Sequence, residues 1–332
     1  MPRVKMPNLM RPAAIAAAAG AAALTVVTGC TSSGGEDHDL SKTSIKVGVP
    51  ASVDAAPIYI GLEHNLFTKE GLDVQPVTIK PGQGLKALAD GDVDVVLTDY
   101  VSLFKEQAAG KDLRILAEGY QAGPGTLEIV VPDNSPIMAP ADLVDKAIAV
   151  DQRKGIGELL TVASLEADNI TLADPDQTFR PMPFDQMATA LRDGTVQAAW
   201  MPEPYVSAAE QGSKGIPGVR RLLDTAAGPT AEVPLSGYVA SASWTKRYKD
   251  VTEAFIAGLD AAKQLTVDRT EVEKILVDRM KVSAQTAALA QIGEFPESLV
   301  PDRLQRVAND MTAQSDFFPS NTSLVVEKYT QR

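Results

Sequence analysis

Thiol and imidazole side chains are nearly absent from this chain. Its 332 residues include one cysteine and two histidines, His38 and His64. Without a second cysteine there is no internal disulfide and no CxxC pair, so thiol redox chemistry and cysteine-based metal sites are excluded. His38 lies in a polar segment and His64 on a predicted helix, so neither a Ser/His/Asp triad nor a zinc centre is expected. We expect no metal, no cofactor and no catalytic residue.

Positive charge and long apolar runs are also scarce. The chain has 31 Lys and Arg against 43 Asp and Glu, a formal net charge of −12. Nucleic-acid binding needs a basic face, so we expect no nucleic-acid partner. Nothing after residue 30 is long and apolar enough to span a bilayer, and no GxxxxGK[ST] phosphate loop is present. A hydrophobic content of 45% is nevertheless enough for ordinary packed cores.

The N-terminus has the order of an export signal. Basic Arg3, Lys5 and Arg11 precede the uncharged, mostly apolar segment 13–27, which is short for a permanent membrane span. The stretch LTVVTGC ends at Cys30 and resembles a bacterial lipobox, in which the cysteine becomes the lipid-modified first residue. A plain secreted protein with an incidental cysteine is the alternative.

Cleavage at that point divides the chain into a leader, a tether and a folded body. We expect a lipoprotein signal peptide over residues 1–29 and a lipidated Cys30 followed by a flexible polar tether to residue 44. Loss of the three basic residues makes the remaining chain more acidic, with a formal charge of −15. Its length suits about two domains.

Strand and helix patterns alternate from residue 45 onward. The expected elements are a strand at 45–49, a helix at 55–67, a strand at 72–77, a helix at 85–89 and a strand at 93–97. This order predicts an α/β unit with a largely parallel sheet. From residue 244 the pattern is helical, with apolar positions at i, i+3 and i+4 spacing.

The α/β pattern occurs twice. Residues 87–93 (ALADGDV) match residues 190–196 (ALRDGTV) at an offset of 103, and in both a glycine ends a helix before a strand. The same junction is common in unrelated proteins, but the order of elements around it also agrees. The sequence therefore predicts two similar α/β lobes.

Ligands of open parallel sheets bind at the carboxyl ends of the strands. Five loops occupy such positions: 51–57, 81–84, 98–100, 151–155 and 201–205. Asp54, Asp99 and Glu203 in these loops could form a general acid–base pair. Such carboxylates more often cap helices or hydrogen-bond a ligand, which is the interpretation we favour.

Two blocks in the first lobe resemble one family of solute-binding proteins. APIYIG at 56–61 and NLFTKEGLDV at 65–74 are similar to its opening motif, with Asn65 where glycine is usual. The similarity continues through GDVD (91–94), AGKDL (109–113) and VQAAW with EPY (196–200 and 203–205). Members of this family bind sulfonates, taurine, nitrate or thiamine-pyrimidine precursors.

The resemblance implies a type II periplasmic binding protein, an α/β fold with two lobes and a ligand cleft between them. Lobe 1 would comprise 45–121 and 236–332, and lobe 2 would comprise 122–235. The implied function is that of a monomeric receptor, lipid-anchored on the outer face of the cytoplasmic membrane, that delivers a small molecule to the permease of an ABC importer. Enzymes of thiamine-pyrimidine or menaquinone type on the same fold, and a non-transport surface sensor, are the alternatives.

The family's motif positions also imply a set of ligand-binding residues. They are Ser52, Asp54, Ala55, Gly82, Gln83, Thr98, Asp99, Arg153, Lys154, Trp200, Glu203 and Tyr205.

Two of these residues depart from the sulfonate and nitrate pattern. Asp99 and Glu203 would be unpaired carboxylates at ligand positions, and an anion beside them would be costly. Arg153 and Lys154 would either neutralise them or hold the anion. We therefore favour an organic ligand with hydrogen-bond donors, with Tyr205 and Trp200 serving either as stacking platforms or as packing residues.

Overall fold

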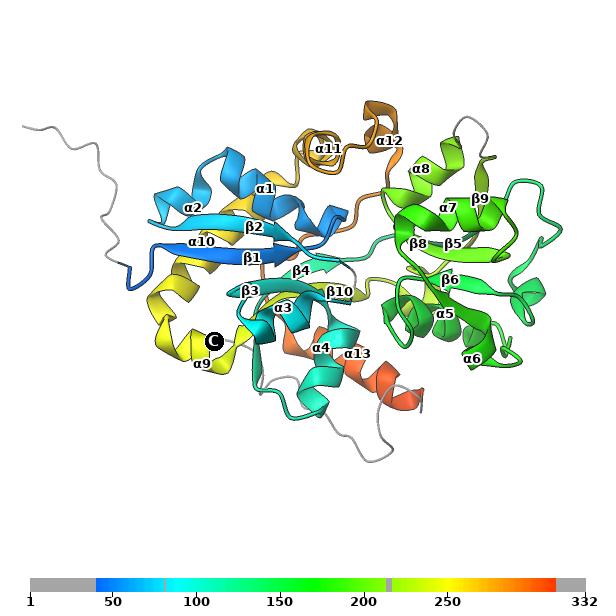
Figure 1. The fold of residues 1–332 in the computed structure, drawn as a ribbon, viewed down its shortest axis with the longest axis horizontal. Coiled ribbons are helices and arrows are strands. Elements are labelled where there is room, and N and C mark those ends of the chain that lie inside the picture. The colour runs from blue at the N-terminus through cyan, green and yellow to red at the C-terminus, as the bar shows by residue number, and fades with distance from the viewer. Residues whose placement is uncertain (1–39, 81, 213–216, 315–332) are drawn as a thin grey trace, which may run out of the picture. The chain divides into compact units, whose positions relative to one another are not determined.

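The computed structural model describes residues 40–80, 82–212 and 217–314. The predicted signal, Cys30 and most of the tether lie outside these residues, so the anchor stays a prediction. In the described part, the main strands form two five-stranded sheets, each with its own helices (Figure 1).

The first sheet has the spatial order β2-β1-β3-β10-β4. Strand β1 pairs in parallel with β2 and β3, whereas β10 is antiparallel to both β3 and β4. The strands are β1 (Ser44–Val49), β2 (Asp73–Thr78), β3 (Val95–Asp99), β4 (Leu113–Gln121) and β10 (Pro234–Ser241).

The second sheet has the order β7-β6-β8-β5-β9. Strand β6 pairs in parallel with β7 and β8, and β5 is antiparallel to β8 and β9. The strands are β5 (Leu127–Pro132), β6 (Ile148–Val150), β7 (Phe179–Pro181), β8 (Ala198–Pro202) and β9 (Val219–Asp224).

The two sheets thus share one plan. In each, a single antiparallel strand follows a crossing of the chain from the other sheet: β5 comes after β4, and β10 comes after β9. The prediction of two similar α/β lobes with largely parallel sheets is confirmed.

The repeated junction supports this correspondence at the residue level. Gly91 and Gly194 both adopt a positive φ, 78° and 70°, next to the ends of their helices. Strands β3 and β8 then begin 103 residues apart, at Val95 and Ala198. Each starts two residues later than the sequence predicted, so their carboxyl ends reach further toward the loops where ligands are expected.

Helices cover both faces of the first sheet (Figure 1). One face packs against α1 (Ala56–Glu63), α2 (Leu66–Lys69) and α10 (Lys249–Leu265), where Phe67 and Phe255 stack at 5.8 Å. The other packs against α4 (Tyr100–Ala108) and α13 (Pro301–Ala313). The remaining helices of this half are α3 (Gly84–Asp90), α9 (Ala242–Arg247), α11 (Arg269–Asp278), α12 (Ala284–Leu289) and the 3-10 helix η1 (Val53–Ala55).

The second sheet is covered in the same way. Its helices are α5 (Ile156–Ala167), α6 (Pro175–Thr178), α7 (Phe184–Arg192) and α8 (Tyr205–Gln211), with 3-10 turns η2 (Pro140–Leu143) and η3 (Gly228–Thr230). Met187, Leu191 and Val206 of α7 and α8 pack on one face of the sheet. Leu159 and Leu160 of α5 belong to the cluster on the opposite face, with Ile148 and Trp200.

The helix predicted over 55–67 is interrupted. Asn65 has a φ of 56°, in the left-handed region, and separates α1 from α2. Among residues with a Cβ atom, asparagine tolerates this conformation best, which explains why it can stand where the family usually has glycine.

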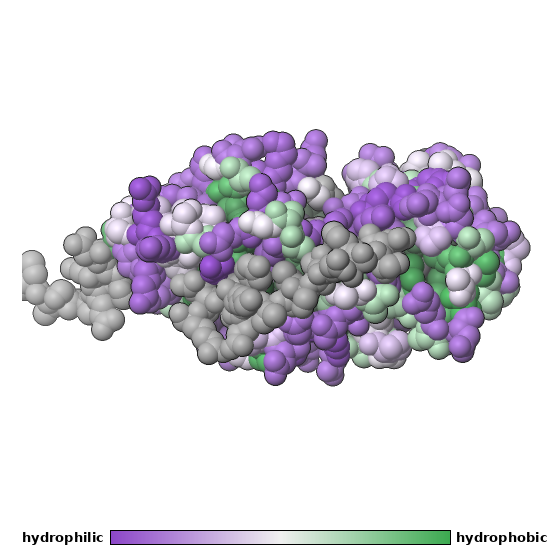
Figure 2. Space-filling model, turned by 90° about the horizontal axis from the view of Figure 1, so that it is seen from below, coloured by the Kyte–Doolittle hydropathy of each residue, from purple (hydrophilic) through white to green (hydrophobic). Residues whose placement is uncertain are grey.

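Among the described residues, no helix combines the length and apolar character needed to cross a bilayer. Figure 2 shows one face on which hydrophobic areas are interrupted by hydrophilic residues.

Candidate functional site

A cavity of about 120 Å³ lies where strands from both sheets end. Its lining includes residues at or just beyond the carboxyl ends of β1, β3, β6 and β8. These are the strand ends at which α/β proteins bind ligands. Because both sheets contribute, a molecule in this cavity would contact both halves of the fold.

The cavity brings together many of the residues that the sequence predicted. Asp54 lies in η1 after β1, Thr98 and Asp99 end β3, and Glu203 follows β8. The predicted residues in the lining are Ser52, Asp54, Gly82, Thr98, Asp99, Trp200 and Glu203.

Three aspartates shape the electrostatics of the cavity. Asp54 is 7% exposed and bonds to the Ser52 hydroxyl, while Asp99 accepts a 2.8 Å bond from the backbone N–H of Ser102. Burial raises the pKa of both carboxyls, against these hydrogen bonds. Burial and the nearby charge of Asp99 raise the pKa of Asp151 to about 7.

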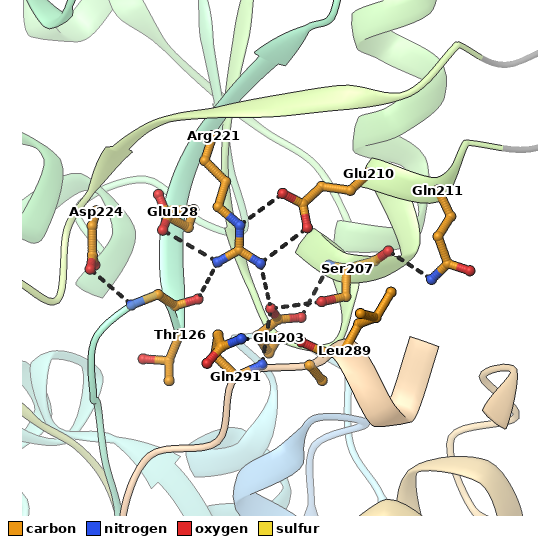
Figure 3. A network of polar contacts seen from close by, with 12 residues as sticks. Thr126, Glu128, Glu203, Ser207, Glu210, Gln211, Arg221, Asp224, Leu289 and Gln291 are labelled. Atoms are coloured by element: carbon orange, nitrogen blue, oxygen red, sulfur yellow. Dashed lines mark hydrogen bonds and ion pairs between the residues drawn. The ribbon is translucent and has the colours of Figure 1, made fainter. Parts of the chain in front are cut away.

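Glu203 is not the unpaired carboxylate that the sequence suggested. It is 1% exposed, and its Oε1 lies 3.0 Å from Nη2 of Arg221, which also contacts Glu210 at 2.8 Å and Glu128 at 3.4 Å (Figure 3). The sequence could not reveal this pair, because Arg221 lies on β9 and reaches Glu203 only when β9 joins the sheet.

Glu203 also accepts hydrogen bonds from two other segments. The hydroxyl of Ser207 on α8 donates at 2.9 Å, and the backbone N–H of Gln291, after α12, donates at 3.2 Å (Figure 3). This side chain therefore links the pocket wall to α8, β9 and the segment that follows α12. Positioning of these elements is a clear role for it.

Arg153 and Lys154 do not serve the aspartates as expected. The guanidinium of Arg153 binds Glu158 at 3.1 Å and Asp176 at 2.8 Å. Neither Arg153 nor Lys154 belongs to the cavity lining. Lys154 contributes its backbone: its N–H donates to Glu158 at 2.7 Å and its carbonyl accepts from Lys105 at 3.3 Å. Among the described residues neither forms an ion pair with Asp99 or Glu203, so the expected neutralisation is not seen. The alternative, that they hold an anion, stays a prediction.

Three further predicted residues lie next to the cavity and outside its lining. Ala55 is fully buried, and Gln83 is an exposed residue preceding α3. The Tyr205 hydroxyl donates a 3.0 Å bond to the carbonyl of Ala51, which joins α8 to the loop after β1. Tyr205 also packs against Phe184, with ring centroids 5.2 Å apart.

Trp200 forms a fixed wall. It is 2% exposed, its indole N–H donates to Thr225 at 2.9 Å, and its ring lies so close to Gly157 that a Cβ atom there would be 2.6 Å away. Packing holds the ring while one side contributes to the cavity lining. The structure thus shows the packing role of this residue, and stacking on a ligand stays a prediction.

Several lining residues escaped the sequence analysis. Asp151 is the first residue after β6, so the strand-end rule marked its loop without selecting it. Phe184 begins α7, and Tyr120 and Ser236 come from the two strands beside the crossings. Nothing in the local sequence distinguishes these last residues from ordinary core positions.

The described residues offer no metal centre. No group of three or more His, Cys, Asp or Glu side chains in this part of the chain is placed to hold a metal ion. His64 lies away from the cavity, with Nε2 3.0 Å from a carboxylate oxygen of Glu271.

Comparison with known proteins places this geometry in a family. Residues 52–271, which contain the cavity and most of both sheets, match the family model described as NMT1/THI5 like. The chain belongs to the NMT1/THI5-like family. This confirms the kinship that the sequence blocks at 56–74 indicated.

A curated relative of this NMT1/THI5-like chain comes from Bacillus subtilis (strain 168) and bears the name "Putative binding protein YtlA". It is 23% identical over 225 residues, which cover 67% of this chain and 66% of the relative. The chain thus spans about two-thirds of the length of the curated relative it matches.

Solved structures show the same fold. The periplasmic aliphatic sulphonate binding protein SsuA from Escherichia coli has a TM-score of 0.70 at 22% identity, covering 87% of this chain and 97% of its own. The periplasmic nitrate-binding protein NrtA from Synechocystis PCC 6803 has a TM-score of 0.72 at 18% identity, covering 88% and 87%. The NMT1/THI5-like chain therefore has the two-lobe α/β fold of periplasmic binding proteins, as predicted.

Proposed function

We propose that this protein is an extracytoplasmic receptor that captures a small organic solute and delivers it to an ABC importer. The observation that carries the proposal is the cavity, which both sheets line at the carboxyl ends of their strands. A site of this kind gives a ligand simultaneous contact with two lobes, and hinge closure then couples binding to a change in the outer surface.

Contacts across the mouth of the cavity support such coupling. Gln152, after β6, donates from Nε2 to the Ser102 hydroxyl at 2.9 Å, and the Tyr205 hydroxyl binds the carbonyl of Ala51 at 3.0 Å. Gly82 has a φ of 70° and lies so near Gln152 that a Cβ atom would meet Oε1 at 2.9 Å. Polar contacts of this kind can be exchanged for contacts with water when two lobes separate.

The location follows from the predicted anchor. A diacylglyceryl group on Cys30 would hold the receptor at the outer face of the cytoplasmic membrane, beside its permease. The transport role itself is carried over from fold relatives whose names describe binding of sulphonate or nitrate, and fold alone does not establish it.

An enzyme on the same fold is the second candidate, and Asp151 is the observation that favours it. A carboxyl with a pKa of about 7 in a cavity is suited to general acid–base catalysis. The described lining also contains Asp54, Asp99 and Glu203, but it holds no histidine and no cysteine, so binding remains the better-supported function.

A thermal-melt screen of the full chain in detergent tests both candidates. A ligand that binds only the folded state adds about 2.7 kcal/mol to the free energy of unfolding at a hundred times its dissociation constant. The receptor proposal expects an upward shift with a compound that is recovered chemically unchanged. A bound compound that is recovered altered would instead establish the enzyme.

A further inference from the structure

The cavity lining contains more acidic side chains than basic ones. The charged side chains in its described lining are Asp54, Asp99, Asp151, Glu203 and Lys80. Arg221 pairs with Glu203, and Lys80 is an exposed residue at the edge. No ion pair joins any of the three aspartates to a Lys or Arg among the described residues, so their charges are left for whatever occupies the cavity.

The three aspartates also act on one another. All three side chains line the same cavity, and the charge of Asp99 raises the pKa of both Asp54 and Asp151. The other titratable or cationic group acting on Asp99 is Lys105 of α4, whose Nζ is bonded to the carbonyl of Lys154 at 3.3 Å. This lysine belongs to a neighbouring hollow and not to the lining of the cavity.

Acceptor atoms in the cavity are left without donors. Oδ1 of Asp151 is buried and has no hydrogen-bond partner among the described residues. The hydroxyl of Ser236 is likewise unpartnered at 3% exposure, although it lies near enough to Asp54 to lower that carboxyl's pKa. A buried polar atom without a partner destabilises the folded state, and a donor on a ligand would remove this penalty.

The walls strengthen any charge interaction made there. Leu97, Leu127 and Leu235 line the cavity with the rings of Phe184 and Trp200, whose centroids are 6.1 Å apart. Apolar walls lower the local dielectric, so attraction between opposite charges is stronger than in water. The faces of aromatic rings also attract cations.

An anion would find little to hold it. Bidentate binding of a sulfonate or nitrate is typically the work of arginine. Here Arg153 is directed to Glu158 and Asp176, and Arg221 is shared among Glu203, Glu210 and Glu128. A further negative charge beside the three aspartates would be strongly disfavoured.

We propose that the cavity takes a small organic cation, whose positive charge is balanced by the carboxylates of Asp54, Asp99 and Asp151 along the lining, and that it excludes sulfonates and nitrate. The class is organic because much of the lining is apolar or aromatic, with Leu127, Phe184 and Trp200 among its residues. The inference rests on the proposed function and names the chemical class of its solute. An ammonium or amidinium group on a flat, compact skeleton has the charge and size that the cavity favours.

Calorimetry on the full chain at pH 8 with three probes of one shape tests this. Benzamidine is cationic, benzamide neutral and benzenesulfonate anionic, and ethanolammonium and nitrate extend the two charge classes. We expect benzamidine to bind at least tenfold more tightly than benzamide, a difference of about 1.4 kcal/mol, and benzenesulfonate and nitrate not to bind.

Variants then assign the preference to the cavity. Asp151→Asn and Asp54→Asn should each weaken benzamidine at least tenfold while leaving benzamide unchanged. Asp168→Asn, at the exposed end of α5, is the matched control and should bind all probes as the parent does. Two independent site variants keep the test decisive if one of them does not fold.

The other outcomes distinguish failure of the cation preference from failure of the proposed receptor function. Binding of benzenesulfonate or nitrate in preference to the cations would overturn the inference and leave the receptor proposal standing. Equal binding of benzamidine and benzamide would also overturn it. Failure of every probe of either charge would count against both the inference and the proposed function.

Discussion

At the scale of single residues, two carboxyls of the cavity differ in how many hydrogen-bond and charge partners surround them. Asp151 and Glu203 both follow strands of the second sheet and both contribute to the lining. Glu203 has an arginine and several donors, whereas Oδ1 of Asp151 has no partner among the described residues. The first arrangement stabilises a fold, and the second leaves an acceptor available to a ligand.

Asp151→Asn should therefore stabilise the unliganded protein in a pH-dependent way. Because the pKa of Asp151 is raised from 3.8 to about 7, its ionisation destabilises the folded state fully above pH 7. This penalty disappears as the pH falls toward 3.8. Denaturant unfolding should show a gain of about 2 kcal/mol at pH 8 that is lost by pH 4, after discounting for the solvent-facing part of the side chain.

Asp168→Asn, which is exposed, should change the free energy of unfolding by less than about 0.5 kcal/mol at either pH. An equal gain for Asp151→Asn at both pH values would contradict the electrostatic explanation.

At the scale of elements, one arginine connects five segments. Arg221 on β9 binds Glu203 after β8, Glu210 on α8 and Glu128 on β5, and its Nη1 donates to the carbonyl of Gly125 at 2.8 Å (Figure 3). Glu203 extends the network to Gln291 at 3.2 Å. Burial and the charge of Asp224 raise the pKa of Glu128 to about 7, against the opposing effect of Arg221.

Arg221→Ala should destabilise the protein by about 3 kcal/mol in denaturant unfolding, because it leaves Glu203 buried without its cation. Adding Glu203→Gln to this variant should restore part of the lost stability, because the amide carries no charge that would be buried without a partner. Arg192→Ala is the matched control: its ion pair with Asp193 is exposed and should be worth less than about 1 kcal/mol. If the two arginine variants lowered the free energy of unfolding equally, the network around Arg221 would add no more stability than an exposed ion pair.

The ends of helices and strands were predicted less accurately from the sequence than the elements themselves. The helix predicted over 55–67 had the right apolar spacing, but the left-handed Asn65 divides it. Strands β3 and β8 were located correctly by their glycine junctions and displaced by two residues at the start. Periodicity reports the face of an element well, whereas its ends depend on capping and on pairing with neighbouring strands.

At the scale of the whole molecule, the anchor and the pocket serve one purpose in the proposed function. Cys30→Ser removes the thiol that would carry the lipid, so the protein should leave the membrane fraction. Fractionation of cells, followed by immunoblotting, measures this. A processed Cys30→Ser chain that still sediments with membranes would contradict the lipid anchor, and the parent chain run alongside is the control.

The sequence by itself determined the fold class, the twofold repeat, the family and the loops that line the cavity. These follow from local information: hydrophobic period, glycine junctions and short motifs, each contained within a few turns of chain. It also identified Asp54, Asp99 and Glu203 as the carboxyls to explain, because they follow strands in an α/β pattern.

Only the tertiary structure decided which charges are satisfied. Arg221 reaches Glu203 across 18 positions of sequence, and Asp151 and Asp99 line one cavity from different sheets. Arg153, which lies close to Asp151 in sequence, is directed away to Asp176. Electrostatic pairing depends on distance in space and on burial, and neither quantity can be read from the amino-acid sequence. That is why the loops that line the cavity could be predicted from the sequence, while the pairing of its carboxylates could not.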